Sequence, residues 1–300
     1  MAKIIITGIC GFIGRHVAHA LVARGDEVHG IDLADATALP ASVIMHRADL
    51  ADLEACRQPL TDVDGIIHLA GISRVSEARA HPERTLRANI LGSAHLFQIA
   101  AAQKNKPWII LGSTREVELL HQRGQPRSLQ ELYAISKSTM ESLAFSFARE
   151  SGNALLVLRL SDVYGDPGDP SKKLFPTLIR RAREHLPLTI DPSSHGVQFY
   201  FTHIDDVVRS VIEGCHRLAT AAAPIYALQR VWDCNHPTES LELARMITAI
   251  GHSSSTIQSP PPTVTIDPQP DSNLQELPFT PSISLAEGIR RQFDTTGKHG

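Results

Sequence analysis

The stretch KIIITGICGFIGRHVAHALVARG, from Lys3 to Gly25, combines three features in a fixed order. An apolar run typical of a strand leads directly into a glycine-rich loop and then into an amphipathic helix. Gly8, Gly11 and Gly14 allow a tight turn, a close approach of the backbone to a diphosphate, and close packing of the helix on the strand. The start of the helix offers unpaired N–H groups to an anion. The stretch therefore predicts the first strand, loop and helix of a dinucleotide-binding fold.

The second predicted strand ends in Asp32, 18 residues after Gly14. An acidic residue at this place accepts hydrogen bonds from ribose hydroxyls and repels a 2′-phosphate. The residues that follow, Leu33, Ala34 and Asp35, offer no cation to neutralise such a phosphate. The sequence therefore predicts that the cofactor is NAD rather than NADP.

Short apolar runs alternate with amphipathic stretches as far as about Gly165. The runs are KIIIT, EVHGI, SVIMH, GIIHLA, WIIL and ALLVLRL, at residues 3–7, 27–31, 42–46, 65–70, 108–111 and 154–160. This alternation predicts βαβ units, and hence an α/β fold with a doubly wound parallel sheet of Rossmann type.

The pattern changes after Gly165, where prolines become frequent and helices predicted near 174–185, 204–218 and 239–250 are separated by loops. We expect an NAD-binding domain over residues 1–165, to which 204–235 return. A smaller C-terminal region over 166–203 and 236–300 would bind the substrate. Prolines in 252–272 exclude a regular helix there, and the sequence leaves open whether 252–282 are ordered.

Bulk composition excludes several classes of protein. With 300 residues and 42% hydrophobic content the chain can bury a large core, and a net charge of −3 gives no indication of nucleic-acid binding. No apolar segment has the length of a membrane span, and no spacing of histidines or cysteines predicts a metal site. Because the four cysteines are widely scattered, we expect a cytoplasmic protein without disulfides.

The motif YAISK places Tyr133 and Lys137 four residues apart, so on a helix they share one face. The lysine ammonium can lower the pKa of the phenol and make it a useful base. Thr114 ends the apolar run IILGST, where its hydroxyl can share a substrate oxygen with Tyr133. These three residues are the candidate catalytic groups.

Together these motifs resemble the extended short-chain dehydrogenase/reductase family, which includes NAD-dependent nucleotide-sugar epimerases, 4,6-dehydratases and decarboxylases. The resemblance covers nearly the whole chain and depends on the order of TGICGFIG, ADL, HLAG, RANILGS, the Ser-Thr pair, YAISK, RLSDVYG and FTHIDDV. It implies that Tyr133 is the base, that Thr114 takes the place of the family's catalytic Ser/Thr, and that Lys137 binds the nicotinamide ribose.

The resemblance also implies a wider set of contacts. Further cofactor-binding residues would be Phe12, Ile13, Leu33, Asp49, Leu50, Leu69, Ala70, Gly71 and Asn89, with Asp49 and Leu50 beside the adenine and Ala70 and Gly71 along the diphosphate and ribose. Substrate-binding residues would be Ser113, Glu116, Asp162 and His203. Arg115, whose guanidinium suits an anion, would bind a carboxylate or phosphate of the substrate or would pair with Glu116 or Glu118 at the surface.

Four departures from the family pattern concern the substrate. Glu118 and Leu119 replace the Tyr-Gly that usually follows Val117. Dehydratases and decarboxylases often read Ser-Thr-Asp-Glu or Thr-Ser-Glu at this strand end, so here Glu116 is kept and Arg115 replaces the residue before it. The family's NVYGP is written DVYGD, from Asp162 to Asp166. Phe199 stands where an arginine commonly holds a nucleotide diphosphate. These changes leave the identity of the substrate open.

We therefore expect an NAD-dependent enzyme that oxidises and reduces a sugar hydroxyl or keto group on a nucleotide-linked sugar, with epimerisation as the leading reaction. One alternative is a dehydrogenase or reductase of a keto-sugar or alcohol without a nucleotide. A second, 4,6-dehydration or decarboxylation, is disfavoured by Arg115, and a third is an inactive NAD-binding regulatory protein. By similarity to the family, helices over 87–103 and 131–149 would form a homodimer interface.

Overall fold

A computed structural model describes residues 1–35, 38–122, 131–166, 173–191, 197–259 and 275–294. The chain divides into two compact units, each described by itself. Unit 1 contains Met1–Leu160, Val208–Arg230 and Pro268–Pro278, and unit 2 contains Ser161–Val207, Val231–Asp267 and Phe279–Gly300. The chain thus returns to unit 1 twice. The sequence suggested the first return but not the second, which brings a late strand to the sheet. Most of the proline-rich segment, 260–274, lies outside the described residues.

Unit 1 is built on an eight-stranded sheet with the order β14-β11-β6-β5-β4-β1-β2-β3. Its strands are β1 (Lys3–Thr7), β2 (Glu27–Asp32), β3 (Ile44–Arg47), β4 (Gly65–His68), β5 (Trp108–Thr114), β6 (Leu155–Leu160), β11 (Tyr226–Val231) and β14 (Glu276–Leu277). The pairs from β3 to β6 and the pair β11–β14 run parallel. From β3 to β6 this is the order of a doubly wound dinucleotide-binding fold, as the sequence predicted.

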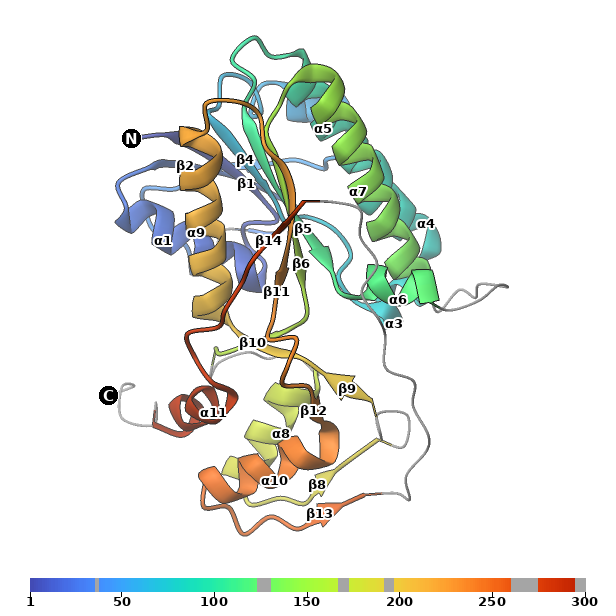
Figure 1. Cartoon of the computed structure of the whole chain (residues 1–300), viewed down its shortest axis with the longest axis vertical. Helices are drawn as coiled ribbons and strands as arrows, with labels where there is room; N and C mark the ends of the chain where they lie inside the picture. The colour runs from blue at the N-terminus through green and yellow to red at the C-terminus, as the bar shows by residue number, and fades with distance from the viewer. Residues whose placement is uncertain (36–37, 123–130, 167–172, 192–196, 260–274, 295–300) are drawn as a thin grey trace. The chain divides into compact units, whose positions relative to one another are not determined.

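Helices cover both faces of this sheet. Their bounds are α1 (Phe12–Ala23), α2 (Leu53–Arg57), α3 (Val75–Ala80), α4 (Pro82–Leu86), the π-helix η1 (Arg87–Leu91), α5 (Gly92–Ala102), α6 (Glu116–Gln122), α7 (Leu132–Ser151) and α9 (Ile204–Thr220). Figure 1 shows α1 and α9 on one side of the strands and α5 and α7 on the other. In the parts of the chain that the structure describes, no helix combines the length and apolarity needed to cross a bilayer.

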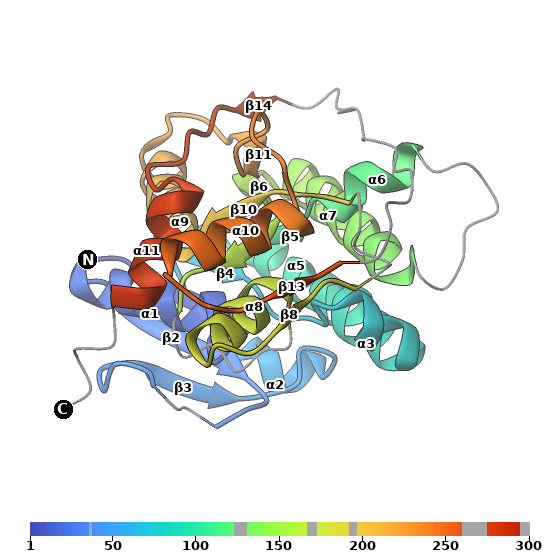
Figure 2. The same cartoon turned by 90° about the horizontal axis from the view of Figure 1, so that it is seen from below.

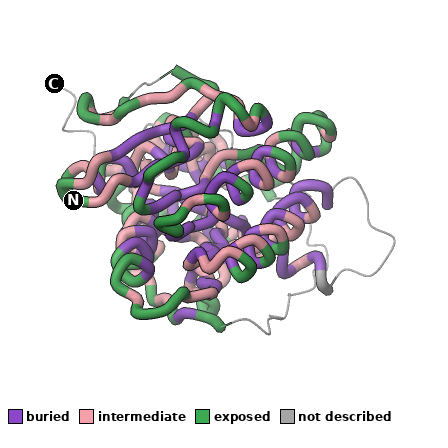
Figure 3. The backbone as a smooth tube through the Cα atoms, turned by 90° about the horizontal axis from the view of Figure 1, so that it is seen from above, coloured by how far each residue is buried: buried purple, intermediate pink, exposed green. Residues whose placement is uncertain are grey.

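The core of unit 1 follows from strands that are buried on both faces. Ile4, Ile5 and Ile6 of β1 are fully buried, and every residue of β5 and β6 is buried. A continuous apolar run suits such a strand, because helices shield it on both sides. Along the helices, in contrast, the backbone in Figure 3 changes between buried and exposed turn by turn. The strand expected over 108–111 continues to Thr114, so the Ser-Thr pair lies inside the sheet.

The described residues of unit 2 form helices α8, α10 and α11 and short strand pairs. The helices are α8 (Leu174–Arg183), α10 (Ser240–Ile250) and α11 (Leu285–Asp294), and the strand pairs are β7 (Asp162–Tyr164) with β10 (Phe201–His203), β8 (Leu188–Thr189) with β13 (Ile257–Gln258), and β9 (Gln198–Phe199) with β12 (Thr238–Glu239). Helices α8 and α10 lie side by side in Figures 1 and 2. They enclose an apolar core of their own with Tyr164 and Phe175.

Candidate active site

The glycine-rich loop connects β1 to α1 at the carboxyl edge of the sheet. Gly8 has φ +72°, and a Cβ there would lie 2.7 Å from the backbone nitrogen of Ala70, so a side chain does not fit. A Cβ at Gly14 would lie 2.3 Å from the carbonyl oxygen of Gly8. Gly11 is the N-cap of α1 and places no side chain over the start of the helix. The loop therefore has the close backbone packing that a dinucleotide diphosphate requires.

Asp32 closes the other side of this loop. Its carboxylate accepts hydrogen bonds from the backbone N–H of Cys10 at 2.9 Å and of Ala34 at 3.0 Å. Each carboxylate oxygen can accept a second bond, so the ribose of a cofactor still finds acceptors here. The glycine loop and Asp32 together fit NAD, because they provide both a diphosphate cradle and an acidic ribose partner.

A cation that the sequence did not suggest lies beside Asp32. Register between β2 and β3 pairs Asp32 with Arg47, whose guanidinium bonds the carboxylate of Asp35 at 2.9 Å. Arg47 is 72% exposed and Asp35 82% exposed along their side chains. Asp35 thus engages a cation that lies one strand away from Asp32, the expected ribose ligand.

The other expected cofactor residues surround the same edge. Leu69, Ala70 and Gly71 directly follow β4, and Asn89 lies in η1 with its side chain fully buried. Asn89 binds the segment after β4 in two ways: its amide oxygen accepts from the N–H of Ile72 at 2.7 Å, and its amide nitrogen donates to the carbonyl of Ile72 at 3.1 Å. Asn89 thus acts as a brace for this segment.

The remaining expected cofactor residues differ in exposure. Leu50 is buried, Asp49 bonds the N–H of Ala51 at 2.9 Å, and Leu33 is 57% exposed. Phe12 and Ile13, in the first turn of α1, are half-buried. Their contacts with NAD stay predictions.

A buried polar chain runs behind this edge. The carbonyl of Asn89 accepts from the hydroxyl of Ser93 at 2.6 Å, so Ser93 has its oxygen free to accept from Nε2 of His68 at 2.8 Å. The Nδ1 atom of His68 then accepts from the hydroxyl of Thr7 at 2.7 Å. Burial, and then the charge of Lys137, lower the pKa of His68 to about 3. His68 is therefore neutral, with its proton on Nε2.

Helix α7 carries the Tyr-Lys pair. Both side chains are buried, and the ammonium of Lys137 donates to the carbonyl of Gly112 at 3.0 Å, two residues before Thr114 on β5. Burial lowers the pKa of Lys137 to about 8, and the charge of Glu141 opposes this shift. Tyr133 packs with Ile72 in a small apolar cluster. The structure thus places the lysine at the end of β5, one helical turn after the tyrosine.

The four expected residues from Ser113 to Glu116 have different environments. Thr114 is buried, and its hydroxyl accepts from the N–H of Glu116 at 3.3 Å. The hydroxyl of Ser113 donates instead to the buried carboxylate of Glu141 at 2.5 Å. Arg115 donates its N–H to the carbonyl of Leu160. A substrate contact of Ser113 stays a prediction, although its hydroxyl is already engaged inside the protein.

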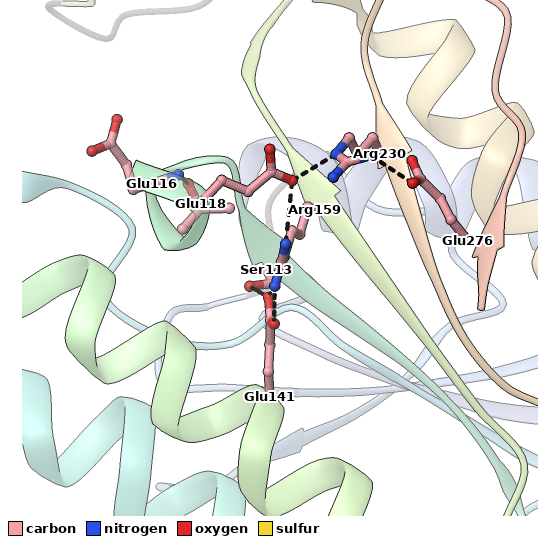
Figure 4. Close-up of polar contacts among 8 residues, drawn as sticks. Ser113, Glu116, Glu118, Glu141, Arg159, Arg230 and Glu276 are labelled. Atoms are coloured by element: carbon pink, nitrogen blue, oxygen red, sulfur yellow. Dashed lines mark hydrogen bonds and ion pairs between the residues drawn. The ribbon is translucent and has the colours of Figure 1, made fainter. Parts of the chain in front are cut away.

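Behind Ser113 lies a row of alternating charges that we call the charge ladder: Glu141, Arg159, Glu118, Arg230 and Glu276 (Figure 4). Arg159 binds both oxygens of Glu141, at 3.0 and 2.8 Å, and reaches Glu118 at 3.2 Å. Arg230 binds Glu118 at 2.8 Å and Glu276 at 2.5 Å. The ladder explains Glu118, the residue that departs from the family pattern, because Glu118 lies between two arginines. Glu116 points away from the ladder (Figure 4).

Sequence reasoning did not identify the ladder as part of the site. One signal was available for Glu141, which follows Lys137 by four residues and so shares its helix face. Burial alone would lower the pKa of Arg159, but Glu141 and Glu118 more than offset it and raise the pKa. Arg159 therefore keeps its charge although it is buried.

Two expected substrate residues belong to unit 2. Asp162 begins β7, and its N–H donates to the carbonyl of Tyr200 at 3.1 Å. His203 ends β10 and is buried edge-on against Tyr164, and its Nδ1 accepts from the N–H of Asp205 at 3.2 Å. Within unit 2, Phe199 stacks on Phe201, so an aromatic surface stands where the family pattern has an arginine. Substrate binding by Asp162 and His203 stays a prediction.

Comparison with known proteins identifies relatives of this chain. UDP-glucuronate 4-epimerase 2 of Arabidopsis thaliana is 30% identical over 238 residues, covering 70% of this chain and 53% of that protein. UDP-glucuronate 4-epimerase 1 of the same plant is 29% identical over 236 residues, with coverage of 70% and 54%. The chain thus spans about half the length of these relatives. UDP-glucuronic acid decarboxylase 1 of A. thaliana is 26% identical over 314 residues, covering 96% of this chain and 68% of that protein.

Solved structures share the fold. UDP-glucose 4-epimerase from Thermotoga maritima, solved with UDP-glucose, has a TM-score of 0.78 at 22% identity, with 97% of each chain covered. UDP-glucuronic acid 4-epimerase from Bacillus cereus, solved with UDP-glucuronic acid and NAD, has a TM-score of 0.74 at 22% identity, with coverage of 97% and 98%. The sequence model of the NAD dependent epimerase/dehydratase family matches residues 4–223. With that match and the glycine loop, acidic ribose partner and Tyr-Lys pair in place, the chain belongs to the NAD-dependent epimerase/dehydratase family.

Proposed function

We propose that this chain is an NAD-dependent epimerase of a UDP-linked sugar, with UDP-glucuronate as the first substrate to test. The names of its relatives support this substrate, since several are UDP-glucuronate 4-epimerases. Arg115 supports it as well, because a guanidinium suits the carboxylate that distinguishes UDP-glucuronate from UDP-glucose.

One observation carries the proposed chemistry: the buried ammonium of Lys137 lies 3.0 Å from the carbonyl oxygen of Gly112, at the end of β5. A cation fixed there favours the ionised form of Tyr133, one turn earlier on the same helix. The phenolate of Tyr133 would remove the proton from a sugar hydroxyl, and Thr114 would hold the same oxygen through its own hydroxyl. Return of that proton from Tyr133 would complete the cycle.

NAD would be held by the glycine loop at Gly8 and Gly11, by Asp32 at the ribose, and by Lys137. The chemistry that the bound cofactor supplies is reversible acceptance of a hydride. The residues of this chain fix the sugar oxygen and move its proton.

The test is formation of the 4-epimer from UDP-glucuronate, followed by NMR with the purified protein. We expect Tyr133→Phe to lower turnover by about 100-fold or more while NAD binding stays near normal, because only the proton acceptor is lost. Tyr226→Phe, a tyrosine on β11, is the matched control and keeps its rate. Stoichiometric consumption of added NAD without any epimer would instead indicate a one-directional dehydrogenase.

We infer further that the protein is a homodimer, assembled through the helices over 87–103 and 131–149. Leu91 on the first is 41% exposed, and Leu143 and Phe147 on the second are only partly buried. Apolar residues at such positions favour burial against a second copy. Light scattering that gives only a mass near 32.7 kDa would contradict the dimer.

A further inference from the structure

The carboxylate of Glu141 is surrounded by donors that hold it in one place. It is 5% exposed, accepts the hydroxyl of Ser113 at 2.5 Å, and is gripped through both oxygens by Arg159 at 3.0 and 2.8 Å. A bidentate pair of this kind fixes direction as well as distance. Glu141 is therefore held against the end of β5 and β6 although it belongs to α7.

Lys137 lies one helical turn before this carboxylate. Residues four apart on a helix are neighbours, so the charge of Glu141 acts on the ammonium of Lys137 at close range. Burial drives Lys137 toward its neutral form and the charge of Glu141 acts in the opposite direction, and the two effects together leave its pKa at about 8. A neutral Lys137 would no longer stabilise the phenolate of Tyr133.

The other groups around Lys137 do not take this part. From β4, His68 is neutral and so supplies no charge, and from β5 the contact is the carbonyl of Gly112. On α7 itself the titratable neighbours are Tyr133 and Glu141. Arg159 lies beyond Glu141 and binds it, and Glu118 offsets part of the arginine's charge. Among the described residues, Glu141 is therefore the anion that acts on Lys137.

We propose that Glu141 is a positioning residue of the active site: held by Ser113 and Arg159, its buried carboxylate keeps Lys137 charged beside Tyr133. The effect of this role on catalysis rests on the proposed function, but the charge on Lys137 can be measured without substrate. The rest of the charge ladder, through Glu118 and Arg230 to the partly exposed Glu276, neutralises Arg159 from its other side.

The first experiment titrates isotope-labelled lysine side chains by NMR in the cofactor-free protein, with the Lys137 signal assigned from its loss in Lys137→Met. In the wild type we expect its midpoint near pH 8. In Glu141→Gln, which keeps the size and loses the charge, the midpoint should fall by about one pH unit. Glu150→Gln removes an exposed carboxylate later on α7 and should leave the midpoint in place.

A second variant tests the same role in case Glu141→Gln does not fold. Glu141→Gln leaves Arg159 with only Glu118 as a partner, which is costly for a buried cation. The double variant Glu141→Gln/Arg159→Met removes both members of the pair and should still lower the Lys137 midpoint. A folded variant of either kind in which Lys137 titrates as in the wild type would overturn the proposal.

The second readout is the pH dependence of epimerisation. The alkaline limb of kcat should move to lower pH in Glu141→Gln, the direction in which the NMR midpoint moves, because Lys137 must be protonated to support Tyr133. A structural role alone would lower kcat equally at every pH. If the wild type forms no epimer, the proposed function fails, while the NMR titration still decides the role of Glu141.

Discussion

The carboxylate of Asp32 accepts a hydrogen bond from the backbone N–H of Cys10, so the expected ribose ligand also holds the glycine-rich loop. Asp32→Asn replaces one acceptor oxygen by an NH2 group. This donor would face the N–H of Ala34 or of Cys10, so one of the two hydrogen bonds is lost. We expect NAD affinity to fall at least tenfold, or by ~1.4 kcal/mol, in isothermal titration calorimetry. Wild-type protein should bind NAD at least tenfold more tightly than NADP.

Cys10→Ala is the matched control for this effect. It keeps the backbone N–H that bonds Asp32 and removes the thiol with its weak contact to the carbonyl of Ala34 at 3.7 Å, so NAD affinity should stay within about twofold of the wild type. A loss in Cys10→Ala as large as in Asp32→Asn would show that the side chain, and not the backbone bond, holds the loop.

Asp35 should limit the binding of NADP. Asp35→Ala removes the carboxylate that engages Arg47, a residue in register with Asp32, and so frees its guanidinium to pair with a 2′-phosphate. We expect NADP affinity to rise several-fold, a gain of about 1 kcal/mol for an exposed charge pair, with NAD affinity unchanged. Addition of Arg47→Ala should abolish the gain; if the gain persists, the cation is not the cause.

His68 should make the protein sensitive to acid. Its pKa is lowered to about 3 in the fold, by burial and then by Lys137, against about 6.5 in the unfolded chain. Between these values the unfolded chain binds more protons, so the contribution of His68 to stability is complete above pH 6.5 and falls as the pH falls. The loss between pH 6.5 and pH 4.5 should be roughly 2 kcal/mol.

Urea unfolding at several pH values measures this loss. His68→Asn should be less stable than the wild type at pH 8, because the bonds to Thr7 and Ser93 are disturbed, and should lose less stability on acidification. His216→Asn, an exposed histidine on α9, should keep the wild-type slope. A slope in His68→Asn equal to that of the wild type would assign the acid sensitivity to other groups.

Local sequence signals predicted the glycine-rich loop and the Tyr-Lys pair. The glycine loop was recognisable because strand, loop and helix follow one another within Lys3–Gly25, and Tyr133 and Lys137 because they share one helix face. The charge ladder had no such signal, since Glu118 meets Arg230 across 112 residues. Contacts of this kind depend on the order and register of strands, which periodicity does not reveal.

The same limit applies to the environment of Asp32. The sequence showed no cation among the residues directly after it, because Arg47 becomes its neighbour only through the register between β2 and β3. It also could not show that Ser113 faces the interior while the neighbouring Thr114 remains the candidate catalytic hydroxyl. Adjacent strand residues point to opposite faces, and only the packing of α7 decides which hydroxyl meets Glu141.

Arg115 should decide between UDP-glucuronate and UDP-glucose. Its backbone is fixed at the end of β5 by the bond to Leu160, and its permanently charged guanidinium suits a sugar carboxylate. Arg115→Ala should lower kcat/KM for UDP-glucuronate tenfold or more, about 1.4 kcal/mol, with little change for UDP-glucose. Arg115→Lys should keep part of the preference, because a lysine retains the charge but not the planar fork.

The same guanidinium argues against dehydration. Loss of water from a 4-keto intermediate needs a group that donates a proton to the leaving hydroxyl, and an arginine with a pKa above about 12 cannot do so near neutral pH. Incubation with UDP-glucose and NAD should therefore give no 4-keto-6-deoxy product by mass spectrometry. Such a product would refute this argument. If Arg115→Ala lowers kcat/KM equally for UDP-glucuronate and UDP-glucose, Arg115 shapes the site but does not bind the carboxylate.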